Sequence, residues 1–91
     1  MTNLEDAPLQ QLRKRLSSLK ANYPTGSSTQ VAVAVELGAL IRALREQRGW
    51  SIHQLAKVAD CNLRPVHRLE AGRALPSTAF ISRLLYAFEH G

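Results

Sequence analysis

The sequence predicts a small all-α protein with a single core. Its 91 residues are 45% hydrophobic, which is enough for one compact domain, since domains usually span roughly 50 to 200 residues. Apolar residues recur at spacings of three and four along most of the chain, as on one side of a helix. Glycine and proline interrupt this pattern at a few points and divide the chain into short helices.

The first predicted helix lies in residues 1–22, where Asp6 precedes Pro8 as at a helix start. Such a basic, amphipathic helix could bind a phosphate backbone or a membrane surface, pair with a second subunit, or dock on its own domain. Docking or a dimer contact is favoured, because four leucines are too few for an independent coiled coil. The apolar seam consists of Leu9, Leu12, Leu16 and Leu19.

Residues 23–29 are predicted to form a linker, because Pro24 and Gly26 break the helical pattern among hydroxyl residues. A second helix is predicted from Gln30 until the chain stops it at Gly49. The valine-rich run at residues 31–35 leaves a short strand as an alternative there. The apolar side of this helix consists of Val33, Leu37, Leu40, Ile41 and Leu44.

Two short helices follow, and the connection between them is only a few residues long. Ser51 is placed to cap the first of them. Asn62 is placed to cap the second, which ends at Gly72. The short connection predicts a steep crossing, as in a helix-turn-helix. The inward residues of the pair are Ile52, Leu55, Ala56, Ala59, Val66 and Leu69.

Two prolines bear on the last two helices. Counted from Asn62, Pro65 falls at the third helical position, where the usual interior penalty of about 3 kcal/mol does not apply in full. Pro76 is predicted to lie in the first turn of a final helix. The inner stripe of that helix consists of Phe80, Leu84, Leu85 and Phe88.

Four motifs occur in order between Leu37 and Ser77, namely "LG..IR.LRE.RG", "S..QLA", "V.RLEAG" and a proline followed by serine. Together they resemble the helix-turn-helix domain of the Xre family, the phage repressor and Cro type. The resemblance implies a five-helix, lambda-repressor-like domain at residues 30–91, with an extra N-terminal amphipathic helix. Three positions depart from the family pattern, and Pro65 is the largest departure. Asp60 stands where many relatives have glycine, but aspartate tolerates the left-handed conformation better than most residues, so the turn is expected to survive. Ile52 stands where glutamine is common.

In that family the helix after the turn lies in the DNA major groove, with its first residues against base edges. The resemblance therefore implies base contacts from Asn62, Leu63, Arg64 and Arg68. Arginine can bind guanine O6 and N7 together, whereas leucine offers only apolar contact to a thymine methyl. Packing against the preceding helix is the structural alternative for Leu63. For His67, on the outward side, the alternatives are a bond to DNA and simple solvation.

Contacts to phosphates are implied at the end of this helix and beyond it. Arg73 and the backbone amides near Ser77 are placed to hold phosphates, which set register without carrying sequence information. Arg42, Arg48 and Lys57 are weaker candidates for the same task.

Glu70 is an acidic residue on the helix that is expected to face a polyanion. The resemblance implies that it pairs with Arg45 of the preceding long helix and so belongs to the architecture. Deleting either partner of such a pair costs roughly 3 to 5 kcal/mol when burial is deep.

The charge balance and the resemblance point to the same function. Lys and Arg number 12 against 7 Asp and Glu, a net charge of +5 that favours an anionic partner. The leading hypothesis is a sequence-specific DNA-binding transcriptional regulator, a repressor that binds double-stranded DNA at a palindromic operator as a homodimer. The alternative is an antitoxin whose N-terminal helix binds a toxin protein and which autoregulates its operon. A phage, a plasmid or a restriction system would each suit such a protein.

Other function classes find little support. The histidines and the single Cys61 show no metal-ligand spacing, and no nucleophile lies beside a base in a known pattern, so neither an enzyme nor a cofactor is expected. One cysteine forms no intramolecular disulfide, which suits a reducing cytosol. The polar, acidic start of the chain and the lack of a long apolar run predict a cytoplasmic, nucleoid-associated protein without a membrane span.

Overall fold

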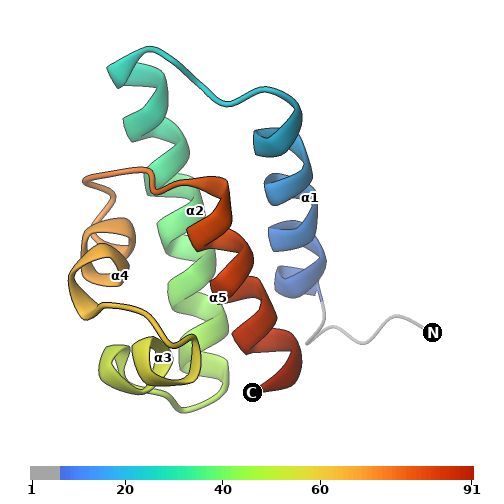
Figure 1. The fold of residues 1–91 in the computed structure, drawn as a ribbon, viewed down its shortest axis with the longest axis vertical. Helices are drawn as coiled ribbons and strands as arrows, with labels where there is room; N and C mark the ends of the chain where they lie inside the picture. Colours follow the sequence, from blue (N-terminus) through green and yellow to red (C-terminus); the bar gives the residue numbers. More distant parts are fainter. Residues whose placement is uncertain (1–6) are drawn as a thin grey trace.

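The computed structural model describes residues 7–91, and within this range the chain forms five helices and no strand. The predicted all-α fold is confirmed, and the strand alternative for residues 31–35 is wrong because that run lies inside a helix. Asp6, expected before the first helix, lies outside the described residues. The helices are α1 (Ala7–Ala21), α2 (Ser27–Gln47), α3 (Ile52–Val58), α4 (Leu63–Glu70) and α5 (Thr78–His90) (Figure 1).

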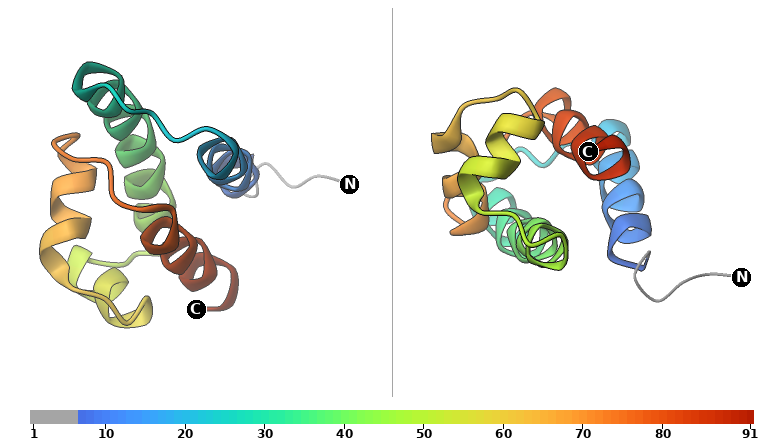
Figure 2. Two further views of the ribbon diagram at one scale, coloured as in Figure 1. Left: turned by 45° about the horizontal axis from the view of Figure 1, so that its top comes forward. Right: turned by 90° about the horizontal axis from the view of Figure 1, so that it is seen from below.

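The long helix α2 organises the bundle. It packs against α1 and α4, while α5 packs against α1 and α3. Figure 2 shows from two further sides that α1 and α4 lie on opposite sides of the molecule. The N-terminal helix is therefore far from the outer surface of α4.

The core draws on all five described helices. The four leucines of α1 are buried, so its apolar seam is used inside the protein. The six inward residues predicted for α3 and α4 are buried except Ile52, which is half-buried. The other helices contribute Ala34, Leu37, Ile41, Leu44, Ile81, Leu84, Ala87 and Phe88.

On α2 and α5 the predicted apolar stripes are slightly rotated from the observed ones. Val33 and Leu40 are only half-buried, and so are Phe80 and Leu85. Each of these two helices packs against two neighbours at once, so small residues such as Ala34 also become buried where the neighbouring helices approach closely.

Two helix starts differ from the prediction. Helix α2 begins at Ser27 rather than Gln30, which shortens the predicted linker of residues 23–29. Helix α5 begins at Thr78, after a cap at Ser77 whose hydroxyl accepts a hydrogen bond from the Phe80 amide at 3.2 Å. Pro76 therefore lies before the cap and not in the first turn. The serine hydroxyl accepts a hydrogen bond from a first-turn amide, and proline has no side-chain acceptor for this role.

Helices α2 and α4 approach closely at Gly38. A Cβ atom added there would lie 2.0 Å from the carbonyl oxygen of Leu69. Only glycine fits this position, so the backbone of α4 rests directly on α2.

Candidate nucleic-acid interface

The helix-turn-helix unit is built from α3, a tight turn and α4. Ser51 caps α3 in a full capping box: its hydroxyl accepts from the Gln54 amide, and the Gln54 side chain accepts from the Ser51 amide. In the turn, Asp60 has a φ of 52°, the left-handed conformation expected of it. The predictions of the Ser51 cap and of the turn at Asp60 are confirmed.

The start of α4 shows how the chain accommodates a proline. Asn62 occupies the N-cap position, but its side chain makes no capping hydrogen bond. The usual partner would be the amide of the third helical residue, which is Pro65 and has no N–H. The predicted position of Pro65 is confirmed, and α4 is helical from Leu63 onward.

The two sides of α4 have opposite character. Val66 and Leu69 are fully buried, whereas Arg64, His67 and Arg68 are exposed. Residues 64, 67 and 68 share one face of a helix because they are spaced by three and four positions. This face is polar, basic and open to solvent.

Leu63 and Asn62 lie at the edge of this face. Leu63 is half-buried and packs against the core, which favours the structural role that was one of its two alternatives. Asn62 is exposed and, since Pro65 has no amide hydrogen to offer, its side chain is left available to a ligand.

The arginines divide into those with partners and those without. Within residues 7–91, six of the nine arginine side chains bind a carboxylate or a backbone carbonyl of the protein. These six are Arg13, Arg15, Arg42, Arg45, Arg48 and Arg83. The three with no such bond to a described residue are Arg64, Arg68 and Arg73. All three lie on α4 or directly after it.

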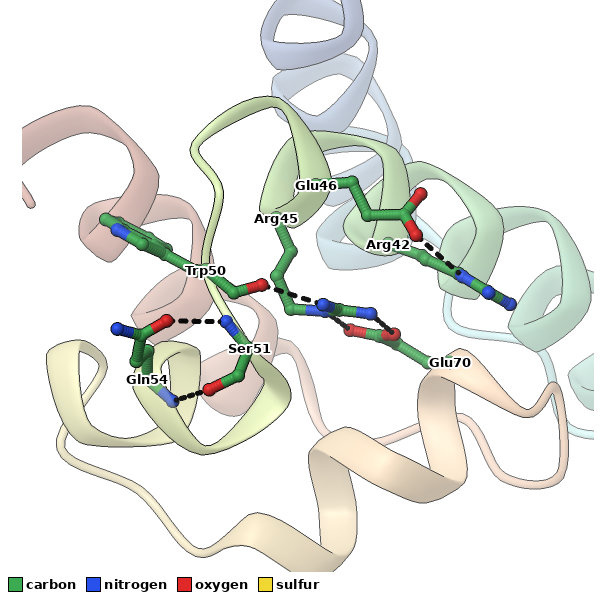
Figure 3. A network of polar contacts seen from close by, with 7 residues as sticks. All are labelled: Arg42, Arg45, Glu46, Trp50, Ser51, Gln54 and Glu70. Carbon is green, nitrogen blue, oxygen red and sulfur yellow. Dashed lines mark hydrogen bonds and ion pairs between the residues drawn. The ribbon is translucent and has the colours of Figure 1, made fainter.

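Arg45 and Glu70 form a two-bond ion pair between α2 and α4 (Figure 3). Nε of Arg45 donates to Oε2 of Glu70 at 2.8 Å, and Nη2 donates to Oε1 at 2.9 Å. A third donor, Nη1, binds the carbonyl oxygen of Trp50 at 2.8 Å. The hydrogen bonds to Glu70 raise the pKa of Arg45 above its ordinary value. The pair neutralises the one carboxylate that α4 carries.

The residues predicted to contact phosphates differ in whether their side chains already bind another group of the protein. Arg73 is exposed and follows Gly72, whose φ is +70°. The Ser77 hydroxyl is engaged as the cap of α5. Of the weaker candidates, Arg42 pairs with Glu46 on the surface. Lys57 is exposed on α3.

Arg48, the remaining weak candidate, is used inside the protein. Its Nη2 donates to the carbonyl oxygen of Phe88 at 2.6 Å, near the end of α5. Its guanidinium also lies over the rings of Phe88 and Trp50, at 5.1 and 5.8 Å from their centres. Arg48 thus fastens the end of α5 to the end of α2.

The chain matches a protein-family model described as a helix-turn-helix domain over residues 36–89, which is more than half of its length. It belongs to this helix-turn-helix family. The match is consistent with the Xre resemblance and indicates a DNA-binding regulator. Comparisons with curated proteins and with solved structures found no match.

One contact of the helix-turn-helix unit was not predicted. Nη1 of Arg83 on α5 donates to the carbonyl oxygen of Asp60 at 2.8 Å and so braces the turn between α3 and α4. Cys61 lies beside it, half-buried, and burial raises the pKa of its thiol. No sequence signal pointed to Arg83, because its partner is a backbone carbonyl that every residue type carries.

Two further observations concern metal binding and membrane insertion. Within residues 7–91 no three or more His, Cys, Asp or Glu side chains are grouped so that they could hold a metal ion. None of the described helices of this helix-turn-helix protein is long and apolar enough to cross a membrane.

Proposed function

We propose that the protein is a sequence-specific transcriptional regulator, a repressor that binds a palindromic operator as a homodimer and inserts α4 into the major groove. The proposal is supported mainly by the three arginines at and after α4 whose side chains bind no carboxylate or backbone carbonyl of residues 7–91. An arginine without an internal partner keeps its donors for an external anion, and DNA is the anion that a helix-turn-helix family indicates.

The three arginines have different tasks in this proposal. Arg64 and Arg68 are one helical turn apart on the exposed face of α4 and contact base edges, with at least one guanine among them. Arg73 contacts a phosphate together with the first amides of α5. Asn62 and His67 lie on or beside the same face and contribute polar contacts to bases or phosphates.

The rigid support of α4 favours specific binding over loose attraction. Its inner side is fully buried, its backbone touches α2 at Gly38, and Glu70 is bound through both oxygens. A helix held by these three sets of contacts presents its side chains in one orientation, as direct contact with base edges requires.

The test compares Arg64→Ala with Arg73→Ala on DNA sites selected from a random library, over a series of salt concentrations. Arg64→Ala is expected to reduce the preference for the selected site roughly 5- to 150-fold, since a good arginine contact to a base is worth about 1 to 3 kcal/mol. Arg73→Ala is expected to weaken all sites alike and to lower the slope of log affinity against log salt by about one.

Arg13→Ala is the matched control. Arg13 is also an exposed arginine, but it binds Glu89 on the side of α1, away from α4. Its removal is expected to leave the site preference and the salt slope unchanged. Equal losses on every sequence from Arg64→Ala and Arg73→Ala would contradict the role of α4.

The antitoxin alternative has weaker support. An antitoxin would need an N-terminal segment that is detached from the rest of the domain and open to a toxin, whereas the four leucines of α1 are buried against α2 and α5. The face that α1 leaves open is polar, with Lys14 and Lys20 exposed on it.

A further inference from the structure

Tyr23 connects the N-terminal part of the chain to the loop beside α4. It lies in the short connection between α1 and α2, half-buried, with its ring packed against the core. Its hydroxyl lies 3.0 Å from the carbonyl oxygen of Leu75 and 2.9 Å from that of Pro76. A phenol has one proton to donate, so the two carbonyls share it.

The backbone around Tyr23 is itself held on both sides. The Asn22 amide continues the hydrogen bonding of α1 by donating to the Ser18 carbonyl at 2.9 Å. On the other side, the Gln30 side chain on α2 donates to the Pro24 carbonyl at 2.8 Å. Tyr23 is therefore a fixed point, anchored to two helices that pack on the core.

The loop that Tyr23 contacts is the one that follows α4. It covers residues 71–77, carries Arg73 and ends at Ser77, the cap of α5. Within the described chain, the backbone hydrogen bonds after α4 end with the Arg73 amide, and those of α5 begin with the cap. Residues 74–76 between them are held by the Tyr23 hydroxyl and by the half-buried side chain of Leu75.

We propose that Tyr23 is a positioning residue for DNA binding. By holding the carbonyls of Leu75 and Pro76, it fixes the loop so that Arg73 and the first amides of α5 meet DNA phosphates at a set distance from α4. A loop that is already ordered in the free protein loses little conformational entropy when it binds DNA, and this raises affinity. The inference rests on the proposed function and adds to it a residue that is not itself in contact with DNA.

The test uses Tyr23→Phe, which removes the hydroxyl and keeps the half-buried ring. One hydrogen bond contributes about 0.5 to 1.5 kcal/mol, so the selected DNA site is expected to bind roughly 2- to 10-fold more weakly. Tyr86→Phe is the matched control, because the same chemical change is made at a mostly exposed tyrosine of α5. It is expected to leave DNA affinity unchanged.

A double-mutant cycle separates positioning from a general loss of stability. In an Arg73→Ala background, Tyr23→Phe is expected to reduce affinity by a smaller factor than in the unmodified protein, because one of the contacts that it positions is already gone and only the first amides of α5 remain. A loss from Tyr23→Phe that is equally large with and without Arg73 would overturn the proposal. So would a DNA affinity of Tyr23→Phe equal to that of the unmodified protein.

A measurement on the free protein keeps this inference distinct from the proposed function. Backbone ¹⁵N order parameters of Ala74, Leu75 and Ser77 are expected to fall in Tyr23→Phe and to stay high in Tyr86→Phe. If the unmodified protein binds no DNA, the proposed function fails, while the order parameters still show whether Tyr23 orders the loop. Unchanged order parameters in Tyr23→Phe would overturn the loop-holding role in either case.

Discussion

At the scale of single residues, the Arg45–Glu70 pair joins three parts of the helix-turn-helix unit. Arg45 lies near the end of α2, Glu70 ends α4, and the Trp50 carbonyl belongs to the segment that leads into α3. The side chains of Arg45 and Glu70 are only 14% and 7% exposed. Loss of one partner would leave the other charge poorly solvated, which is the costly case for an ion pair.

Glu70→Ala is therefore expected to lower the free energy of unfolding by roughly 2 to 4 kcal/mol, near the lower end of the range for buried pairs because Arg45 keeps its bond to Trp50. Glu46→Ala is the control, since it removes an exposed pair with Arg42 whose side chains are 61% and 59% exposed. That change is expected to cost less than about 0.5 kcal/mol. Urea denaturation measures both, and equal costs would show that burial does not decide the value of the pair.

Residue roles could be predicted where a motif or a helical period marked them. Val66 and Leu69 followed from spacing, and Glu70 was assigned to Arg45 through the family motif. Tyr23, Arg48 and Arg83 could not be found in this way. Each binds a backbone carbonyl more than 20 positions away in the chain. Every residue type has such a carbonyl, so the sequence does not mark the partner.

At the scale of helices, the contact between α2 and α4 depends on a position without a side chain. Alanine normally stabilises a helix interior by about 1 kcal/mol relative to glycine. At Gly38 that gain is opposed by overlap with the Leu69 carbonyl, which belongs to backbone and has little freedom to move.

Gly38→Ala is expected to destabilise the protein by a net 1 to 3 kcal/mol or so, because the overlap outweighs the gain in helix propensity. Ala39→Ser, which also adds one heavy atom but at the exposed neighbouring position, is expected to cost at most about 0.5 kcal/mol. Thermal unfolding followed by circular dichroism measures both variants. A Gly38→Ala protein as stable as the parent would mean that α4 can move away from α2 at little cost.

Helix boundaries were predictable where a capping side chain dominates. Ser51 capped α3 as expected. At α2 the composition predicts a linker for the hydroxyl residues after Gly26, yet these residues form the first turn of the helix. Serine and threonine are common both in loops and in first turns. Here the Gln30 side chain folds back onto Pro24, a contact that spacing alone does not reveal.

At the scale of the whole molecule, the arginines on α1 and those on α4 differ in whether a carboxylate of the protein binds them. On α1, Arg13 and Arg15 are paired with Glu89 of α5 and Glu36 of α2. Helix α4 lies on the opposite side of the molecule (Figure 2). Its Arg64 and Arg68 are exposed and bind no carboxylate of the described residues 7–91. Among the arginines, the charge left for an external anion is therefore presented from the side of α4, while α1 exposes the lysines Lys14 and Lys20.

The proposed operator mode makes a prediction for the assembled complex. Two chains are expected to bind one palindromic site, with half-sites about one helical turn of DNA apart, because a two-fold symmetric dimer matches a two-fold symmetric sequence. Native mass spectrometry of the complex gives the number of chains per duplex. A duplex with a single half-site is the control and is expected to bind more weakly. One chain per full site at saturation would contradict the homodimer.

The sequence by itself determined the order of the helices, the turn at Asp60 and the inward side of α4, because apolar spacing, caps and turn residues act over a few positions of the chain. Tertiary structure alone decided which arginines have a partner among residues 7–91. Arg13 meets Glu89, Arg48 meets the Phe88 carbonyl and Arg83 meets the Asp60 carbonyl only after folding brings distant segments together. Ion pairs and hydrogen bonds need contact at about 3 Å, and composition cannot show which charges have found such a partner.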